Sequence, residues 1–162
     1  MKSVLLVRHA KSSWDFDVED FERSLNHRGK TDAPVMAKRL INKEIQIDVF
    51  ISSPAKRALS TAALFAEAFE VKTETIFIVP SLYEPAVQAF YTAINSLDDI
   101  YKITAVFSHN PAITDFANQL TSVRVDDMPT CAIFAVKADI KSWKEFTLAP
   151  KQFWFFDYPK AD

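Results

Sequence analysis

Short hydrophobic runs alternate along the chain with longer segments of helical periodicity, a pattern typical of βαβ units. A strand that is buried on both faces is expected to be a short run rich in Val, Ile and Phe. Five such runs predict strands, at residues 3–7, 48–52, 74–79, 103–107 and 132–137. A sixth run, 143–148, alternates between apolar and polar residues, so we expect an edge or antiparallel strand there.

Four segments between these runs have the apolar spacing of helices, and they cover residues 31–43, 54–69, 86–97 and 111–120. The acidic segment 15–23 lacks periodicity and is expected to be a surface loop. We therefore predict an α/β fold. Residues 1–162 would form a single three-layer α/β/α domain, whose mostly parallel central sheet has an antiparallel edge strand.

Composition and charge limit the classes of function. The chain has 162 residues, of which 49% are hydrophobic and 25% are charged, as in soluble globular proteins. The net charge of −2 shows no basic excess, so we expect no nucleic-acid partner. The single cysteine, Cys131, excludes an intramolecular disulfide, and we expect it to be buried and inert. The apolar stretch 4–7 is too short for a signal peptide or a membrane span, so we expect a cytoplasmic protein.

Glycine is scarce, and this scarcity excludes several phosphate-binding loops. The only glycine is Gly29, whereas average usage of about 7% would give about eleven. The glycine-rich dinucleotide loop, the P-loop and the G-x-S-x-G nucleophile turn all need more than one glycine. Any phosphate must therefore be held by side chains and helix ends.

Charged and polar side chains follow the predicted strands at the points where these strands end. Arg8 and His9 follow the first strand, Arg57 comes shortly after the second, Glu84 follows the third and His109 follows the fourth. Ligands of open parallel α/β sheets bind outside the carboxyl ends of the strands, so we expect these residues to converge.

The residue types favour an anion. Arginine offers a fork of donors that matches phosphate oxygens. Pro54 and Pro111 suit the first helical position, with Ser53 and Asn110 before them as N-caps, so two helix N-termini would also face the phosphate. Three further residues are possible secondary phosphate contacts: Lys11, Ser12 and Asn110. Lys11 is equally compatible with a plain surface position.

The histidines suggest a reaction. A neutral imidazole can attack phosphorus, which makes His9 a candidate nucleophile. His109 would donate a hydrogen bond to the transferring phosphoryl group. Glu84 is a candidate general acid that protonates the leaving group and later activates water; the alternative for Glu84 is a solvated loop carboxylate.

Several motifs resemble those of a known family. Residues 6–10, with Arg8-His9-Ala10, resemble the Arg-His-Gly signature of the histidine phosphatase superfamily. The segment 52–54 followed by Arg57 resembles its second motif, and residues 108–110 resemble its third. The branch that the chain resembles most is that of the small SixA-type phosphohistidine phosphatases, to which residues 24–29 are also similar.

This resemblance implies a phosphoglycerate mutase-like fold and a two-step reaction without metal or cofactor. His9 would become phosphorylated, Arg8, Arg57 and His109 would hold the phosphate, and Glu84 would assist hydrolysis. It also implies a role in signal transduction, with a phosphorylated protein such as a phosphohistidine-containing phosphotransfer domain as partner, or else a small phosphomonoester. We expect a monomer or a weak dimer.

The sequence departs from the family pattern at two positions. Ala10 replaces the usual glycine, and Asp15 stands where mutase-like relatives have an asparagine, so we expect no mutase activity. Two alternatives are also compatible with the sequence: a non-catalytic phosphate- or phosphoprotein-binding module, and a small-molecule phosphomonoesterase of the same fold. A metallohydrolase is disfavoured because two arginines would repel a metal ion. The aromatic tail 153–158 is expected to pack back on the sheet or on a helix, and a dimer contact is the alternative.

Overall fold

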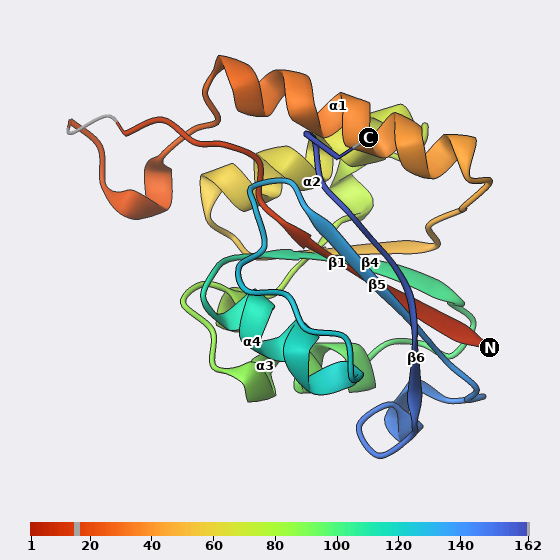
Figure 1. Ribbon diagram of the computed structural model, residues 1–162. Coiled ribbons are helices and arrows are strands. Elements are labelled where there is room, and N and C mark those ends of the chain that lie inside the picture. Colours follow the sequence, from red (N-terminus) through yellow and green to blue (C-terminus); the bar gives the residue numbers. More distant parts are fainter. Residues whose placement is uncertain (15–16, 162) are drawn as a thin grey trace.

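The computed structural model describes residues 1–14 and 17–161, which form one central sheet covered by helices (Figure 1). Six strands in this part of the chain lie in the order β3-β2-β4-β1-β5-β6. Their bounds are β1 (Lys2–Arg8), β2 (Val49–Ser52), β3 (Phe77–Ile78), β4 (Ile103–Ser108), β5 (Ile133–Ala138) and β6 (Lys151–Asp157). Strands β1 to β4 are parallel, β5 is antiparallel to β1, and β6 is antiparallel to β5. The mostly parallel sheet confirms the predicted α/β class.

The helices cover both faces of this sheet and make three layers (Figure 1). Helices α1 (His27–Asn42) and α2 (Lys56–Ala68) lie on one face, and α3 (Val87–Asn95) and α4 (Ala112–Leu120) lie on the other. Alternate residues of β1 point into the two cores that result, because successive side chains of a strand face opposite sides. No helix of the described residues is long and apolar enough to cross a membrane.

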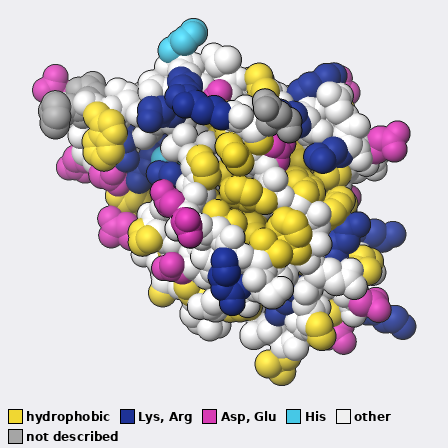
Figure 2. All heavy atoms as spheres, viewed as in Figure 1, with side chains coloured by type: hydrophobic (Ala, Val, Ile, Leu, Met, Phe, Trp, Pro, Cys, Tyr) yellow, Lys and Arg dark blue, Asp and Glu magenta, His cyan; other side chains and the backbone are white. Residues whose placement is uncertain are grey.

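The edge of the sheet next to β5 is formed by a different segment from the one that the sequence predicts. The segment 143–148 is not a strand: Trp143–Glu145 forms a 3-10 turn, in which the buried Trp143 donates from Nε1 to the carbonyl of Tyr101 at 2.9 Å. The edge strand is instead β6, which contains most of the aromatic tail and pairs with β5. The expectation that the tail packs back on the sheet is thus confirmed, and Figure 2 shows hydrophobic side chains gathered over this region.

Two further boundaries differ from the prediction. The run 74–79 contains only the two-residue strand β3, because Thr73–Thr75 forms a 3-10 turn. Helix α1 begins at His27, earlier than predicted, because the side chain of Asn26 accepts a hydrogen bond from the Gly29 amide at 2.9 Å.

Gly29 brings the first turn of α1 against the loop that follows β1. A Cβ atom at this position would lie 2.1 Å from the backbone oxygen of Lys11. The Lys11 oxygen also accepts a hydrogen bond from the amide of Asn26 at 3.0 Å. Glycine is therefore required here for close approach of two backbone segments next to the site, not for an unusual φ angle.

Candidate active site

The two arginines and two histidines that the sequence predicts as site residues lie together at the carboxyl ends of three neighbouring strands, β2, β4 and β1. Arg8, His9, Arg57 and His109 all line one cavity of about 260 Å³. The three predicted secondary residues line it as well. The full lining is Arg8, His9, Lys11, Ser12, Trp14, Arg23, Arg57, His109, Asn110 and Thr130.

His9 is held as a neutral imidazole with one free nitrogen. Its Nδ1 lies 2.8 Å from the backbone oxygen of Ala10. A carbonyl oxygen only accepts hydrogen bonds, so Nδ1 carries the proton and Nε2 keeps its lone pair. Burial lowers the pKa of His9 to about 4, and the charges of Arg57 and Arg8 act in the same direction, whereas the bond to Ala10 opposes them. At neutral pH the ring is therefore uncharged and nucleophilic.

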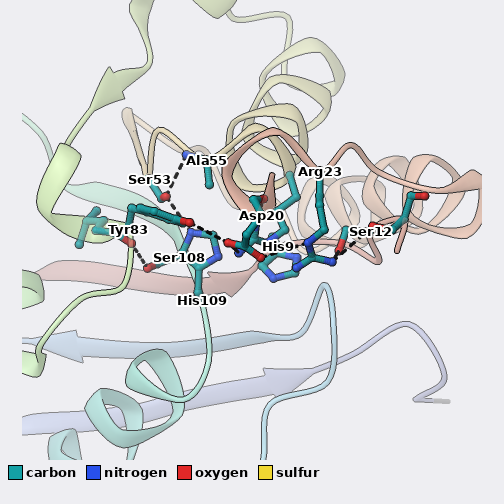
Figure 3. Close-up of polar contacts among 12 residues, drawn as sticks. His9, Ser12, Asp20, Arg23, Ser53, Ala55, Tyr83, Ser108 and His109 are labelled. Atoms are coloured by element: carbon teal, nitrogen blue, oxygen red, sulfur yellow. Dashed lines mark hydrogen bonds and ion pairs between the residues drawn. The ribbon is translucent and has the colours of Figure 1, made fainter. Parts of the chain in front are cut away.

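His109 lies beside His9, with 5.2 Å between the ring centroids (Figure 3). Its Nε2 is 2.7 Å from the hydroxyl oxygen of Ser53, while its Nδ1 is buried and has no hydrogen-bond partner among the described residues. Burial, together with the neighbouring His9 and Arg57, lowers the pKa of His109 to about 3. A buried polar atom without a partner marks a place where a ligand atom can bind.

The two predicted arginines, Arg8 and Arg57, are each anchored through Nη atoms of the guanidinium. Arg57 donates from Nη1 to the backbone oxygen of Asp20 at 2.8 Å and from Nη2 to its carboxylate at 3.1 Å. Arg8 donates from Nη1 to the backbone oxygen of Met128 at 2.8 Å. The Nε atom of both side chains is buried and unpartnered within the described structure. Each arginine thus keeps a donor for an anion, although burial lowers the pKa of Arg8.

The predicted N-caps are wrong. Helices α2 and α4 begin after the two prolines, and neither Ser53 nor Asn110 caps them. Ser53 instead contacts His109, and its hydroxyl accepts from the Ala55 amide at 3.2 Å. The amide of Asn110 donates to Asp127 at 2.6 Å, which fastens the loop before β5. The side-chain oxygen of Asn110, which would be the capping atom, instead accepts from the hydroxyl of Thr114 at 2.6 Å.

Five residues at or near the site are not predicted from the sequence: Trp14, Arg23 and Thr130 line the cavity, and Asp20 and Tyr83 contact residues that line it. The carboxylate of Asp20 accepts from Arg23 Nε at 3.1 Å and from the Tyr83 hydroxyl at 2.7 Å, in addition to Arg57 (Figure 3). Arg23 also donates to the hydroxyl of Ser12 at 2.8 Å. The signal that was available is the position of Arg23, a lone cation at the end of an acidic run. Asp15, the position that argues against mutase activity, lies outside the described residues.

Charge explains how Asp20 behaves. Partial burial raises its pKa, but the Tyr83 hydrogen bond and the charge of Arg57 outweigh this effect and lower the pKa overall. The same hydrogen bond raises the pKa of Tyr83 to about 12. Asp20 is therefore an ionised link between two arginines and a tyrosine that come from three separate segments.

Glu84 stands apart from these contacts. It is exposed, its φ of 48° is in the left-handed region, and it is not among the residues that line the cavity. From its loop the neighbouring Tyr83 reaches the site instead, with its ring centroid 5.8 Å from that of His109. The role of Glu84 as general acid stays a prediction.

A metal site and the hollow beside α3 are the alternatives to this cavity. Among the described residues, no group of three or more His, Cys, Asp or Glu side chains is placed to hold a metal ion. A larger hollow of about 480 Å³ lies between β3 and α3, but its described lining is mainly apolar and contains neither histidine nor arginine. Cys131 is buried, as expected, and burial raises the pKa of its thiol. The anion-binding chemistry is therefore concentrated at the smaller cavity.

The sheet order and the paired histidines and arginines define a class of protein, the α/β proteins with the phosphoglycerate mutase-like fold. The sequence pattern of the histidine phosphatase superfamily (branch 1) matches residues 4–91, more than half of the chain. The chain belongs to this superfamily.

Solved structures share the fold over nearly the whole chain. The protein histidine phosphatase SixA, determined with tungstate, has a TM-score of 0.82 at 21% identity and covers 97% of both chains. A protein assigned as SixA of Agrobacterium tumefaciens has a TM-score of 0.80 at 21% identity, over 98% of both chains. A mycobacterial glucosyl-3-phosphoglycerate phosphatase has a TM-score of 0.69 at 11% identity, over 99% of both chains.

One curated protein is similar in sequence. It is an uncharacterized chloroplastic protein of Arabidopsis thaliana, 27% identical over 154 residues, which are 89% of this chain and 70% of the other. At these identities the solved structures establish the shared fold, and the substrate has to be argued from the site.

Proposed function

We propose that this protein is a metal-independent phosphatase that works through a phosphohistidine intermediate on His9. One observation carries the proposal: the buried, neutral His9 offers an unprotonated Nε2 at a cavity that it shares with Arg8, Arg57 and His109. A nucleophile beside three groups that favour negative charge suits phosphoryl transfer.

In the first step the Nε2 lone pair of His9 attacks phosphorus. A P–N bond forms while the bond from phosphorus to the leaving group breaks, and the leaving group takes the electron pair. The free N–H donors of Arg8 and Arg57 stabilise the charge on the phosphoryl oxygens. We assign the Ser53 hydroxyl as the donor to Nε2 of His109, 2.7 Å away, which leaves the proton of the ring on Nδ1. This N–H would then donate a hydrogen bond to a third phosphoryl oxygen.

In the second step water attacks the phosphorus of phosphorylated His9. The P–N bond breaks, inorganic phosphate leaves, and His9 returns to its neutral form. We assign Glu84 the proton transfers: it protonates the leaving group in the first step and accepts a proton from water in the second. An imidazole is a much better leaving group than an alkoxide, so substrates with a P–N bond depend less on this acid.

For the substrate we infer phosphohistidine on a protein, such as a phosphotransfer domain in a signalling pathway of the cytoplasm. The inference is supported by the resemblance of residues 6–10 and 24–29 to motifs of the superfamily and of its SixA-type branch, and by the fold shared with SixA. The second candidate is a small phosphomonoester, which the likeness to a sugar-acid phosphatase of the same fold favours.

A turnover assay over a substrate panel tests both candidates. The panel contains a phosphohistidine protein, 3-phosphoglycerate and glycerol 3-phosphate, each assayed with and without a chelator. We expect the highest kcat/KM for the phosphohistidine protein, no effect of the chelator, and no turnover by His9→Asn. Binding of phosphate without turnover of any substrate would identify a binding module instead, and inactivation by the chelator would exclude the metal-independent reaction.

A further inference from the structure

Trp14 stands at the edge of the catalytic cavity in a position that the reaction above does not use. Its side chain lines the cavity, yet the residue is 75% exposed. The nucleophile His9, which lines the same cavity, is only 6% exposed. His9 therefore lies at the bottom of the cavity and Trp14 at its mouth.

One face of the Trp14 indole is occupied by Arg23. The guanidinium carbon of Arg23 lies 4.0 Å from the centre of the indole ring, a close cation–π contact. The Arg23 side chain is 9% exposed and is itself anchored by Asp20 and by the hydroxyl of Ser12 (Figure 3). A buried, doubly anchored guanidinium holds the indole in one orientation, while the large exposed fraction of Trp14 shows that much of the ring remains open.

The proposed reaction places the leaving group on this side. In-line displacement at phosphorus requires the leaving group to depart opposite the attacking nitrogen of His9, toward the mouth of the cavity. A flat ring joined to phosphorus directly, as in phosphohistidine, or through one oxygen, as in an aryl phosphate, would reach the mouth and lie against another aromatic ring. A flexible polyol chain presents no flat face to stack.

We propose that Trp14 is a specificity-determining residue whose open face stacks on the planar ring that carries the phosphoryl group, either an imidazole or an aryl ring. This inference rests on the proposed phosphatase function and adds a preference for ring-borne phosphoryl groups over those on polyols. The preorganised indole loses little conformational freedom on binding, so stacking contributes to affinity directly.

The test compares Trp14→Ala and Trp14→Phe with wild type on three substrates: a phosphohistidine peptide, p-nitrophenyl phosphate and glycerol 3-phosphate. We expect Trp14→Ala to lower kcat/KM for the two ring substrates about 3- to 10-fold more than for glycerol 3-phosphate, and Trp14→Phe to restore most of the difference. The matched control is Trp154→Ala, since Trp154 has Lys137 Nζ 4.0 Å from its ring but lies on β6, outside the lining of the cavity.

Two readouts distinguish stacking of Trp14 on the substrate ring from the alternative that Trp14 only holds Arg23 in place. Equal losses on all three substrates, or weaker binding of inorganic phosphate to Trp14→Ala, would overturn the inference, because both would report a disturbed phosphate site. A loss of kcat/KM on only one of the two ring substrates supports stacking and shows whether the preferred ring is an imidazole or an aryl ring. Failure of wild type to form phospho-His9 would refute the proposed function itself, whereas normal phospho-His9 without ring selectivity would refute only the role of Trp14.

Discussion

The floor of the cavity that contains His9 and the rim of this cavity are built in different ways. The floor, which consists of Arg8, His9, Arg57 and His109, is buried or nearly so at the strand ends and the start of α2. The rim, which consists of Trp14, Asp20, Arg23 and Tyr83, belongs to loops and is joined by side-chain contacts that converge on one half-exposed carboxylate.

This difference indicates which residues of the site can be substituted without loss of the fold. The floor follows from the parallel ladder: Arg8 pairs in register with Ser108, and the His9 amide donates to the Ser108 oxygen at 3.1 Å. The rim depends on a few hydrogen bonds to charged groups, each worth about 1.5–3 kcal/mol at most. We infer that the floor sets the chemistry and that the rim sets the choice of substrate.

The largest effect is expected in the floor. Arg8→Ala removes a guanidinium whose free donor faces developing negative charge, so kcat/KM should fall about 10²- to 10³-fold in a steady-state assay. Arg8→Lys keeps the charge but loses the planar fork and should recover only part of the activity. The exposed Arg28→Ala is the matched control. A loss below about tenfold for Arg8→Ala would contradict the division into floor and rim.

Gly29→Val disturbs the backbone contact that joins the floor to the rim loop. The added side chain would begin 2.1 Å from the Lys11 oxygen, so the backbone must move, and we expect the free energy of unfolding in urea to fall by about 3 kcal/mol or more. Lys30→Ala, at an exposed neighbouring position of α1, should be close to wild type. Wild-type stability and activity of Gly29→Val would show that this close approach is unimportant.

A smaller effect is expected in the rim. Asp20→Asn keeps the shape of the side chain but removes the charge between Arg23 and Arg57, so kcat/KM should fall about 3- to 10-fold. A second readout is the pKa of Tyr83, which should fall from about 12 toward its ordinary value near 10 in a spectroscopic titration. Glu19→Gln serves as a control on the same loop. An unchanged Tyr83 pKa would show that Asp20 does not hold this tyrosine in solution.

A more gradual effect, spread over about two pH units, is expected on the pH dependence of stability. Because the pKa of His9 is about 4 in the folded state and about 6.5 in the unfolded chain, the unfolded chain binds more protons between these values. The corresponding stability is complete above pH 6.5 and is lost as the pH falls toward 4. Tm should therefore fall less steeply over this range in His9→Gln than in wild type, whereas the exposed His27→Gln should follow wild type. Equal slopes for His9→Gln and wild type would contradict a buried, neutral His9.

The sequence predicts the floor because each of its residues comes at or shortly after the end of a buried apolar run, and parallel pairing then brings the strand ends together. The rim has no such local signal. Asp20 and Tyr83 are 63 residues apart and meet only after the loops fold against each other. The edge strand could not be predicted from local sequence either, because the segment 143–148 and β6 both contain aromatic residues. Pairing with a distant strand decides between them, since Phe156 of β6 pairs with Phe134 of β5. Trp143, by contrast, is buried as part of a turn.

The central claim is most directly tested by trapping the intermediate. The protein is mixed with a ³²P-labelled phosphohistidine peptide and quenched within milliseconds in base or in acid. It is then separated from the peptide, and the label bound to the protein itself is measured. A phosphoryl group on an imidazole nitrogen is stable in base and labile in acid, so we predict a base-stable, acid-labile label that maps to His9 and is absent from His9→Asn. An acid-stable label, or an equal label on His9→Asn, would contradict the account.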